Sequence, residues 1–413
     1  MILNLSKKSL FLYFFLIISL FIGLLYGEDS GGGGSIVDFE KTWILIEKPF
    51  ELESFIYDFK FPLHYYIGGL VYKISDSVFF VKVFYVILTC FLPLIFYRCL
   101  ELKFPYINKN SLFILSLILL LLPGVRAAAI WPNTQITGVF FFMFSAYNFL
   151  KLEQQNNFTK ISKHLILTLL FMALAVYSRQ IYALIYLYLV FVFFRKYSLK
   201  NFIKLSSIIF LLSIPGLIGV FMVPSTLTLT FDSNLQNSLL VNFSIISFYL
   251  IPVFFLACIT QNIKFSAGKD LILFTFASAI FVIMLSYFFD YNFKLGGGVL
   301  MKVSLLLTKN FYLFFLTSFT GLVLLFWLCA NKINNIILSL IIPIGISAYM
   351  IPQKYFEPMM FILIFLIYNN KVLELILKKK RNIYLLFSFY SLYLIAAVIN
   401  MIYKIKENYI LNL

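Results

Sequence analysis

Eight of the seventeen acidic residues in this chain lie in one short stretch between two long apolar runs. They are Glu28, Asp29, Asp38, Glu40, Glu47, Glu51, Glu53 and Asp58. A carboxylate just outside a membrane can act as a general base that removes a proton from an acceptor hydroxyl. Paired carboxylates can also hold a divalent metal through their oxygens, and a solvated acidic loop is the alternative for any single one of them. The crowding of acids beside an aromatic segment predicts that this stretch does chemistry.

Two groups of acids in this stretch are close in sequence, the pair Glu28-Asp29 and the triplet Asp38-Phe39-Glu40. We predict that Asp38 is the catalytic base, or Asp29 if the intervening glycine run 31–34 folds back, and that Glu40 contacts substrate. Glycine gives that run the freedom to bring backbone close to a ligand. The reaction predicted here requires no cofactor, although a divalent metal could bind the acids. No histidine and cysteine pattern indicates a metal site, because the four cysteines fall within or at the end of apolar runs.

The stretch is followed by the aromatic segment 61–66, Phe-Pro-Leu-His-Tyr-Tyr. Aromatic rings and a histidine suit the face of a sugar or a lipid headgroup, and proline fixes the start of the segment. His64 and Tyr65 are therefore predicted to line the sugar. The alternative is a belt of aromatic residues at the membrane interface.

Basic residues at the expected outer ends of apolar runs are candidates for binding a phosphate. Together with their neighbours Gln180 and Tyr355, the basic residues predicted to bind substrate are Arg126, Arg179, Lys302 and Lys354. Arg179-Gln180 lies between two short apolar runs, and Lys354-Tyr355 precedes Glu357. The alternatives are that the cations reach toward lipid headgroups, or that Lys354 and Glu357 simply pair across one turn of helix.

The chain that positions these residues is 62% hydrophobic and 12% charged over 413 residues. Apolar runs near twenty residues long recur throughout, which predicts an all-α, polytopic transmembrane bundle of about 11–13 spans in a single membrane domain, 1–413. The loop 27–76 is its large first external loop, and the element 62–74 within it is predicted to be amphipathic or re-entrant. The predicted spans are 9–26, 77–99, 111–124, 135–150, 165–177, 181–194, 205–223, 242–260, 271–289, 310–330, 334–350, 358–370 and 383–403.

The basic residues predict the orientation. With the N-terminus in the cytoplasm, alternate loops place the whole formal charge of +16 on the cytoplasmic side, as the positive-inside rule expects. The chain is therefore predicted to be an integral, multi-pass membrane protein whose active site faces the external side. Membrane lipids account for the basic charge, so no nucleic acid partner is expected.

Taken together, these motifs resemble the GT-C class of integral-membrane glycosyltransferases. The closest likeness is to the dolichyl-phosphate-glucose α-1,2-glucosyltransferases. The acidic pair and triplet, the aromatic segment 61–66, the Arg179-Gln180 step and the stretch Lys354-Tyr355-Phe356 follow the order found in that family. The Pro-Pro usual in the family's aromatic element is Phe61-Pro62 here, so the sugar and the acceptor stay open.

The resemblance implies a sugar transfer from a polyprenyl-phosphate donor to a glycan or glycolipid acceptor, by a single inverting displacement. The abundance of Lys, Asn, Ile, Phe, Tyr and Leu fits a bacterial relative that uses undecaprenyl phosphate. Two alternatives from other classes are a flippase or transporter of lipid-linked oligosaccharides and a non-catalytic membrane assembly protein. Translocation needs polar groups at mid-membrane, whereas the candidate residues here lie at the ends of spans.

Overall fold

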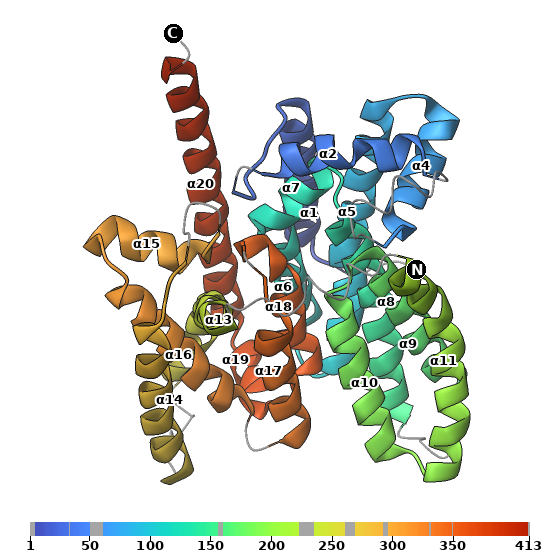
Figure 1. The fold of residues 1–413 in the computed structure, drawn as a ribbon, viewed down its shortest axis with the longest axis vertical. Coiled ribbons are helices and arrows are strands. Elements are labelled where there is room, and N and C mark those ends of the chain that lie inside the picture. The colour runs from blue at the N-terminus through green and yellow to red at the C-terminus, as the bar shows by residue number, and fades with distance from the viewer. Residues whose placement is uncertain are drawn as a thin grey trace. The chain divides into compact units, whose positions relative to one another are not determined.

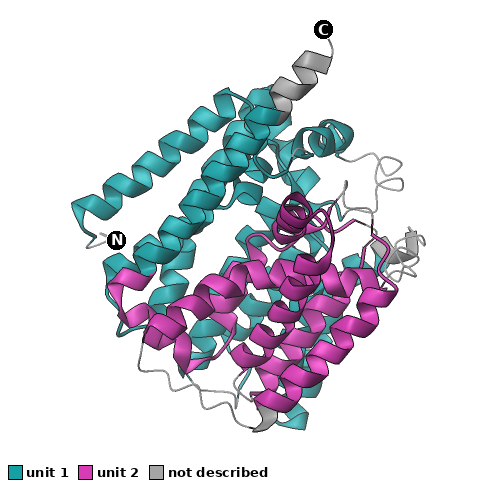
Figure 2. Ribbon diagram, turned by 90° about the vertical axis from the view of Figure 1, so that its left-hand side faces the viewer, with its two compact units in different colours: residues 1–224, 383–413 teal, residues 225–382 magenta. Residues whose placement is uncertain are grey.

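The computed structural model describes residues 5–32, 34–49, 61–155, 160–222, 235–260, 269–291, 296–329, 332–348 and 350–411. All regular secondary structure in these ranges is helical (Figure 1). The helices form two compact units, coloured separately in Figure 2: residues 1–224 with 383–413, and residues 225–382. Because the prediction of one membrane domain concerns how the units are joined, it stays a prediction.

Unit 1 contains the acidic stretch and most of the candidate residues. Its helices are α1 (Lys7–Leu25), α2 (Ser35–Glu47), α4 (Leu63–Ser75), α5 (Val78–Lys103), α6 (Lys109–Leu117), η1 (Ile118–Leu121), α7 (Pro123–Ile130), α8 (Thr134–Gln155), α9 (Lys163–Ser178), α10 (Tyr182–Lys196), α11 (Leu199–Met222) and the part of α20 (Lys380–Leu411) from residue 383 onward. Helices α8, α9, α10 and α11 run side by side, and α2 packs against α4 (Figure 1).

Short polar residues start several of these helices. The side chains of Ser6, Asn108 and Ser162 each accept a hydrogen bond from a backbone N–H in the first turn of α1, α6 and α9. Such caps satisfy N–H groups that have no partner within the helix. The predicted element 62–74 forms a helix, α4, preceded by Pro62.

Unit 2 is organised around α13 (Leu235–Ile259), which packs against α14 (Lys269–Tyr287), α15 (Gly298–Thr308), α16 (Tyr312–Cys329), α17 (Ile333–Gly345) and α19 (Lys371–Lys378). The short elements η2 (Gln353–Tyr355), α18 (Met359–Ile362) and η3 (Leu363–Ile367) complete it. Helix α13 approaches α16 closely at Gly321, where an added Cβ would lie 1.9 Å from the carbonyl oxygen of Phe243.

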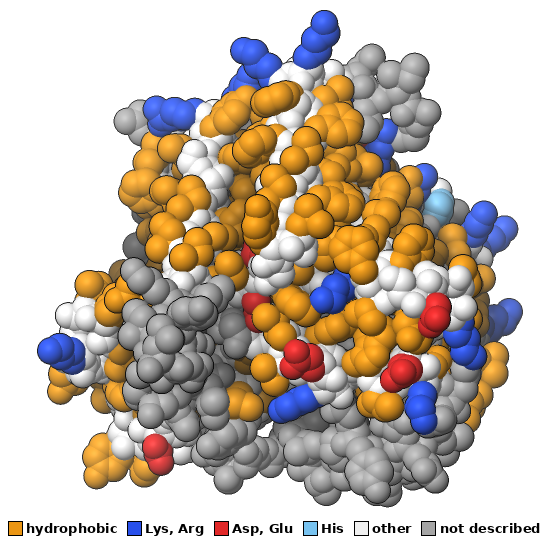
Figure 3. All heavy atoms as spheres, turned by 90° about the horizontal axis from the view of Figure 1, so that it is seen from above, with side chains coloured by type: hydrophobic (Ala, Val, Ile, Leu, Met, Phe, Trp, Pro, Cys, Tyr) orange, Lys and Arg blue, Asp and Glu red, His pale blue; other side chains and the backbone are white. Residues whose placement is uncertain are grey.

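Each of the thirteen predicted spans coincides with a helix or a broken helix, and hydrophobic side chains cover much of the face seen in Figure 3. Among the described residues, six helices are long and apolar enough to cross a membrane, or eight if two bent pairs each count as one span. This is fewer than expected, because helices such as the 16-residue α9 reach only about 24 Å against a hydrocarbon core of about 30 Å. The chain is therefore a multi-pass helical membrane protein with six to eight candidate spans.

One of the bent pairs carries a candidate residue. The helix Lys109–Leu121 and α7 meet at an angle of 61°. Leu122, between them, is extended, as expected for a residue that precedes a proline. The bend starts a new helix at Pro123 and places Arg126 in its first turn.

Candidate functional site

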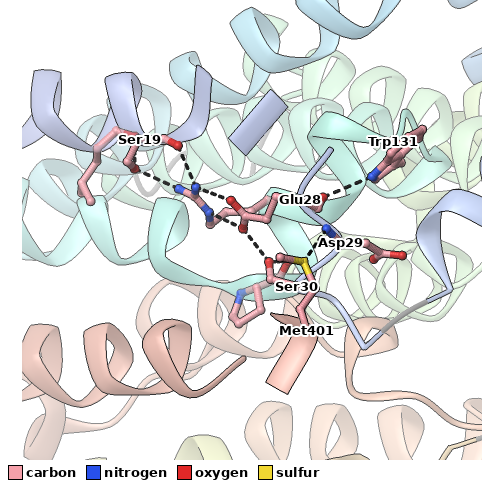
Figure 4. Close-up of polar contacts among 9 residues, drawn as sticks. Ser19, Glu28, Asp29, Ser30, Trp131 and Met401 are labelled. Atoms are coloured by element: carbon pink, nitrogen blue, oxygen red, sulfur yellow. Dashed lines mark hydrogen bonds and ion pairs between the residues drawn. The ribbon is translucent and has the colours of Figure 1, made fainter. Parts of the chain in front are cut away.

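Arg126 and Glu28 form a buried ion pair in unit 1 (Figure 4). The guanidinium donates from Nε to Oε1 of Glu28 at 2.8 Å and from Nη2 to Oε2 at 2.6 Å. It also donates to the hydroxyl and the carbonyl oxygen of Ser19 in α1, at 3.1 and 3.0 Å. Both residues are almost fully buried, at 3% and 6% exposure. The pair therefore ties the start of the acidic stretch to α1 and α7 and uses four of the five N–H donors of Arg126. The predicted role of Arg126 in phosphate binding stays a prediction.

The residues around Glu28 are fixed by further hydrogen bonds. The hydroxyl of Ser30 donates to Oε1 of Glu28 at 2.6 Å, and the indole N–H of Trp131 donates to the Glu28 carbonyl oxygen at 3.2 Å. Gly27 has a φ of +64°, a conformation that side chains disfavour, and an added Cβ would lie 3.4 Å from the Trp131 ring. The turn that leads from α1 into the acidic stretch is thus held on both sides of Glu28.

Asp29 reaches the N-terminus of α2. Its Oδ2 accepts hydrogen bonds from the backbone N–H groups of Ser35 and Ile36, at 2.9 and 3.3 Å. Gly32, between Asp29 and α2, has a φ of +108°, a conformation that favours glycine. Asp29 is 6% exposed, and its Oδ1 has no hydrogen-bond partner in the described part of the chain. One carboxylate oxygen is therefore held in place, while the other is left for a partner that the described residues do not supply.

The triplet lies in the first turns of α2. Asp38 is half-buried in the first turn and Glu40 is exposed, while Phe39 between them is buried. The two acids of the triplet are thus accessible on α2, and Asp29 lies at the N-terminus of the same helix. Of the other four acids of the stretch, Glu47 is exposed at the end of α2, and Glu51, Glu53 and Asp58 lie outside the described residues.

An aromatic cluster covers the inner side of α2. The Phe39 ring lies 5.4 Å from Trp43 and 5.9 Å from Trp131, measured between ring centres, and Trp43 lies 5.1 Å from Tyr72 of α4. Loss of solvent, and then the charges of nearby carboxylates, raises the pKa of Tyr72 above its ordinary value. The cluster joins α2 to α4 and to the segment that follows α7.

Lys82 of α5 lies against this cluster and was not among the predicted site residues. Its ammonium nitrogen is 3.5 Å from the centre of the Trp131 ring and 5.1 Å from that of Phe39. A cation over an aromatic face at these distances is attracted by the ring. The sequence signal was a lysine inside an otherwise apolar run at the end of that run nearest the acidic stretch.

His64 and Tyr65 are buried in unit 1, at 0% and 2% exposure. The Nδ1 of His64 lies 2.8 Å from the hydroxyl of Thr137, and the Tyr85 hydroxyl donates to the His64 carbonyl oxygen at 2.9 Å. These contacts join α4 to α5 and α8. Neither ring is exposed, and their predicted role in lining a sugar stays a prediction.

Arg179 and Gln180 lie at the turn between α9 and α10. Arg179 is half-buried, and its Nη1 donates to Oε1 of the buried Gln135, at 3.2 Å, in the first turn of α8. Gln180 is exposed. Only four positions separate Gln135 from Trp131, so their Cα atoms are within about 15 Å of each other. Arg179 therefore lies near the same end of unit 1 as the aromatic cluster.

The remaining predicted residues belong to unit 2. Lys302 is exposed on α15, while Lys354 and Tyr355 are half-buried in η2. Next to them, Gln353 donates to the Tyr249 hydroxyl at 3.1 Å, and that hydroxyl donates to the buried carboxylate of Glu357 at 3.2 Å. Lys302, Lys354 and Tyr355 were predicted to bind substrate together with residues of unit 1, and that role stays a prediction.

Among the described residues, no group of three or more His, Cys, Asp or Glu side chains is arranged to hold a metal ion. The described candidate residues of unit 1 therefore offer a carboxylate with one unpaired oxygen, a lysine on an aromatic surface and an arginine at the adjoining turn. Comparisons of the chain with protein-family models, with curated proteins and with solved structures found no match.

Proposed function

We propose that the protein is a glycosyltransferase that moves a sugar from a polyprenyl-phosphate donor to a hydroxyl of a glycan or glycolipid, on the external side of the membrane. The observation that carries this proposal is the Asp29 carboxylate. Its Oδ2 is held by two backbone N–H groups of α2, and its buried Oδ1 has no partner in the described structure. A base that is fixed by one oxygen and open at the other is suited to take a proton from an acceptor hydroxyl.

The chemistry is a single displacement with inversion. The acceptor oxygen attacks the anomeric carbon of the sugar as its proton passes to Oδ1 of Asp29. The bond between that carbon and the phosphate oxygen breaks, and its electron pair leaves with the lipid phosphate. One carboxylate suffices for this reaction, and a cation that faces the leaving phosphate stabilises the charge that develops on it.

Between the two acids predicted as the base, the geometry favours Asp29 over Asp38. Asp38 is half-buried on α2 and has an interaction of its own, whereas Asp29 is 6% exposed with an unpaired oxygen. Asp38 and Glu40 then lie on the outer side of the same helix, where they could contact the acceptor. The membrane-spanning character of the chain supports a lipid-linked donor, because such a donor is dissolved in the bilayer that surrounds the helices.

The test uses three variants in membranes supplied with a labelled polyprenyl-phosphate sugar. D29N keeps an oxygen that can accept from α2 but cannot act as a base, and it should lose sugar transfer by about 100-fold or more. D38N should lose less. The matched control D290N changes an exposed aspartate of unit 2 and should transfer at the parent rate. Transfer by D29N and D38N at the parent rate would contradict the catalytic assignment, and absence of transfer by the parent protein with any labelled donor would remove the proposed function.

A further inference from the structure

Lys82 lies between the two acidic segments of unit 1. One of its aromatic partners, Trp131, donates a hydrogen bond to the carbonyl oxygen of Glu28, next to Asp29. The other, Phe39, lies between Asp38 and Glu40 in the sequence. In Figure 4 the Asp29 side chain and Trp131 lie on the same side of Glu28, away from Ser19. The ammonium of Lys82 thus contacts one ring from the triplet segment and a second ring that is hydrogen-bonded to the Glu28-Asp29 segment.

No described residue accepts a hydrogen bond from the Lys82 ammonium. A lysine ammonium has three N–H donors, and Lys82 is half-buried. Within the described residues the ammonium makes no hydrogen bond and no ion pair, and it lies over the two rings. The charge of Glu40 acts on it, but the two groups form no ion pair in the described structure. Because a partly desolvated charge without an acceptor is unfavourable, this position favours an anionic ligand.

The surroundings of Lys82 indicate how that anion arrives. Lys82 is near the start of the candidate span α5, and Phe79, one turn earlier on the same helix face, is 54% exposed. Phe80 is 52% exposed. Large exposed apolar side chains on a membrane-spanning helix face lipid chains, so an anion bound at Lys82 would be the headgroup of a lipid that lies along α5.

We infer that Lys82 binds the phosphate of the polyprenyl donor, with Trp131 and Phe39 holding the ammonium in place. This inference rests on the proposed function, because it assigns one group of the proposed substrate to one residue. The cation would face the phosphate on one side of the Glu28-Asp29 segment while Asp29 faces the acceptor hydroxyl. The leaving phosphate then gains negative charge next to a fixed positive charge, which lowers the barrier to departure.

The test follows binding without sugar transfer. The chain has three tryptophans, so the variant W43F/W327F leaves Trp131, which contacts Lys82, as the only tryptophan, and selective tryptophan excitation makes it the reporter. The purified full-length protein in detergent is titrated with a polyprenyl monophosphate, the leaving group of the reaction. The emission of Trp131 should change to saturation. Adding K82M or K82Q to this background should weaken the apparent affinity by about tenfold or more, whereas K82R should stay within about threefold.

Three other ligands separate the possible sources of the anion. The matched polyprenol, which lacks the phosphate, should give no saturable change. Inorganic phosphate should require a far higher concentration, and phosphatidylglycerol should bind more weakly than the polyprenyl phosphate. If phosphatidylglycerol bound as tightly as the polyprenyl phosphate, Lys82 would be a contact for any anionic membrane lipid. If inorganic phosphate bound as tightly, the polyprenyl chain would contribute nothing to binding. Either result overturns the inference.

Folding and function are controlled in the same background. Thermal unfolding of each Lys82 variant identifies any variant that fails to fold. If K82M and K82Q do not fold, the affinity of K82R can still be compared with that of the parent background. Unchanged affinity of folded K82M would overturn the inference while leaving the role of Asp29 intact. If the parent protein transfers no sugar from any labelled donor but the titrations still depend on Lys82, the proposed function fails and the phosphate site stands.

Discussion

Arg126 and Glu28 are 98 positions apart in the chain and form a bidentate ion pair, with distances of 2.8 and 2.6 Å. The pair fixes the residue that precedes Asp29. The same guanidinium reaches Ser19 in α1. One arginine therefore connects the first helix, the bent segment α7 and the acidic stretch.

Breaking this pair should destabilise the protein strongly. R126A or E28Q leaves a buried charge without its partner, for which we expect a loss of about 3–5 kcal/mol in the free energy of unfolding. The double variant E28L/R126M removes both charges and should lose less than either single variant. The control is E374Q, which breaks the exposed pair of Glu374 and Lys378 and should cost less than about 1 kcal/mol. Chemical unfolding in detergent measures these values, and R126A with the stability of E374Q would show that the pair contributes little.

Asp29 should also control the local stability of α2. D29A removes the acceptor for the N–H groups of Ser35 and Ile36, at a cost of about 1 kcal/mol for the helix end, whereas D29N keeps an acceptor oxygen. Amide hydrogen exchange of the peptide that contains α2 should therefore be faster in D29A than in D29N. The exposed-site variant D290A should exchange there like the parent. Equal exchange in D29A and D29N would mean that the carboxylate does not cap the helix.

Arg179 offers a test of the predicted cation at the turn between α9 and α10. If it faces the donor phosphate, R179A should raise the KM for the polyprenyl-phosphate sugar by about tenfold, corresponding to the loss of one charge-assisted hydrogen bond. R179K should keep part of the affinity. The control K200A changes an exposed lysine of α11. Initial rates over a range of donor concentrations give the KM of each variant for the donor. An unchanged KM in R179A would show that Arg179 does not bind the donor.

Gly321 tests the packing of unit 2. A methyl group there would collide with the backbone of Phe243, 1.9 Å away, so α13 and α16 would have to separate. We expect G321A to cost about 1–3 kcal/mol, even though alanine favours helix more than glycine does. T320A, at the adjacent position on α16, serves as the control and should stay near the parent. Thermal unfolding followed by circular dichroism provides the comparison; a more stable G321A would rule out this close approach.

The sequence alone predicted the helical, multi-pass class, because apolar runs near twenty residues have few other solutions. It also predicted which stretch carries the acids, and that Asp29 would become a candidate if the glycine run folded back. In the described residues the Asp29 carboxylate accepts from the N-terminus of α2 and Gly32 has a positive φ; the role of Asp29 as the base stays a prediction. The number of candidate spans was overestimated, since composition identifies apolar segments but not how many of them are long enough as helices.

Only the tertiary structure decided which side chains meet. Lys82 is the only charged residue in the first twenty positions of α5, and Arg126 is the only one in α7, so neither pattern indicates which face turns toward which neighbour. Three contacts depend on how helices distant in sequence rotate and cross. They are the ion pair of Arg126 with Glu28, the contact of Lys82 with the Trp131 ring and the contact of the buried His64 with Thr137. Those rotations follow from packing between whole helices, and a single sequence contains no local signal for them.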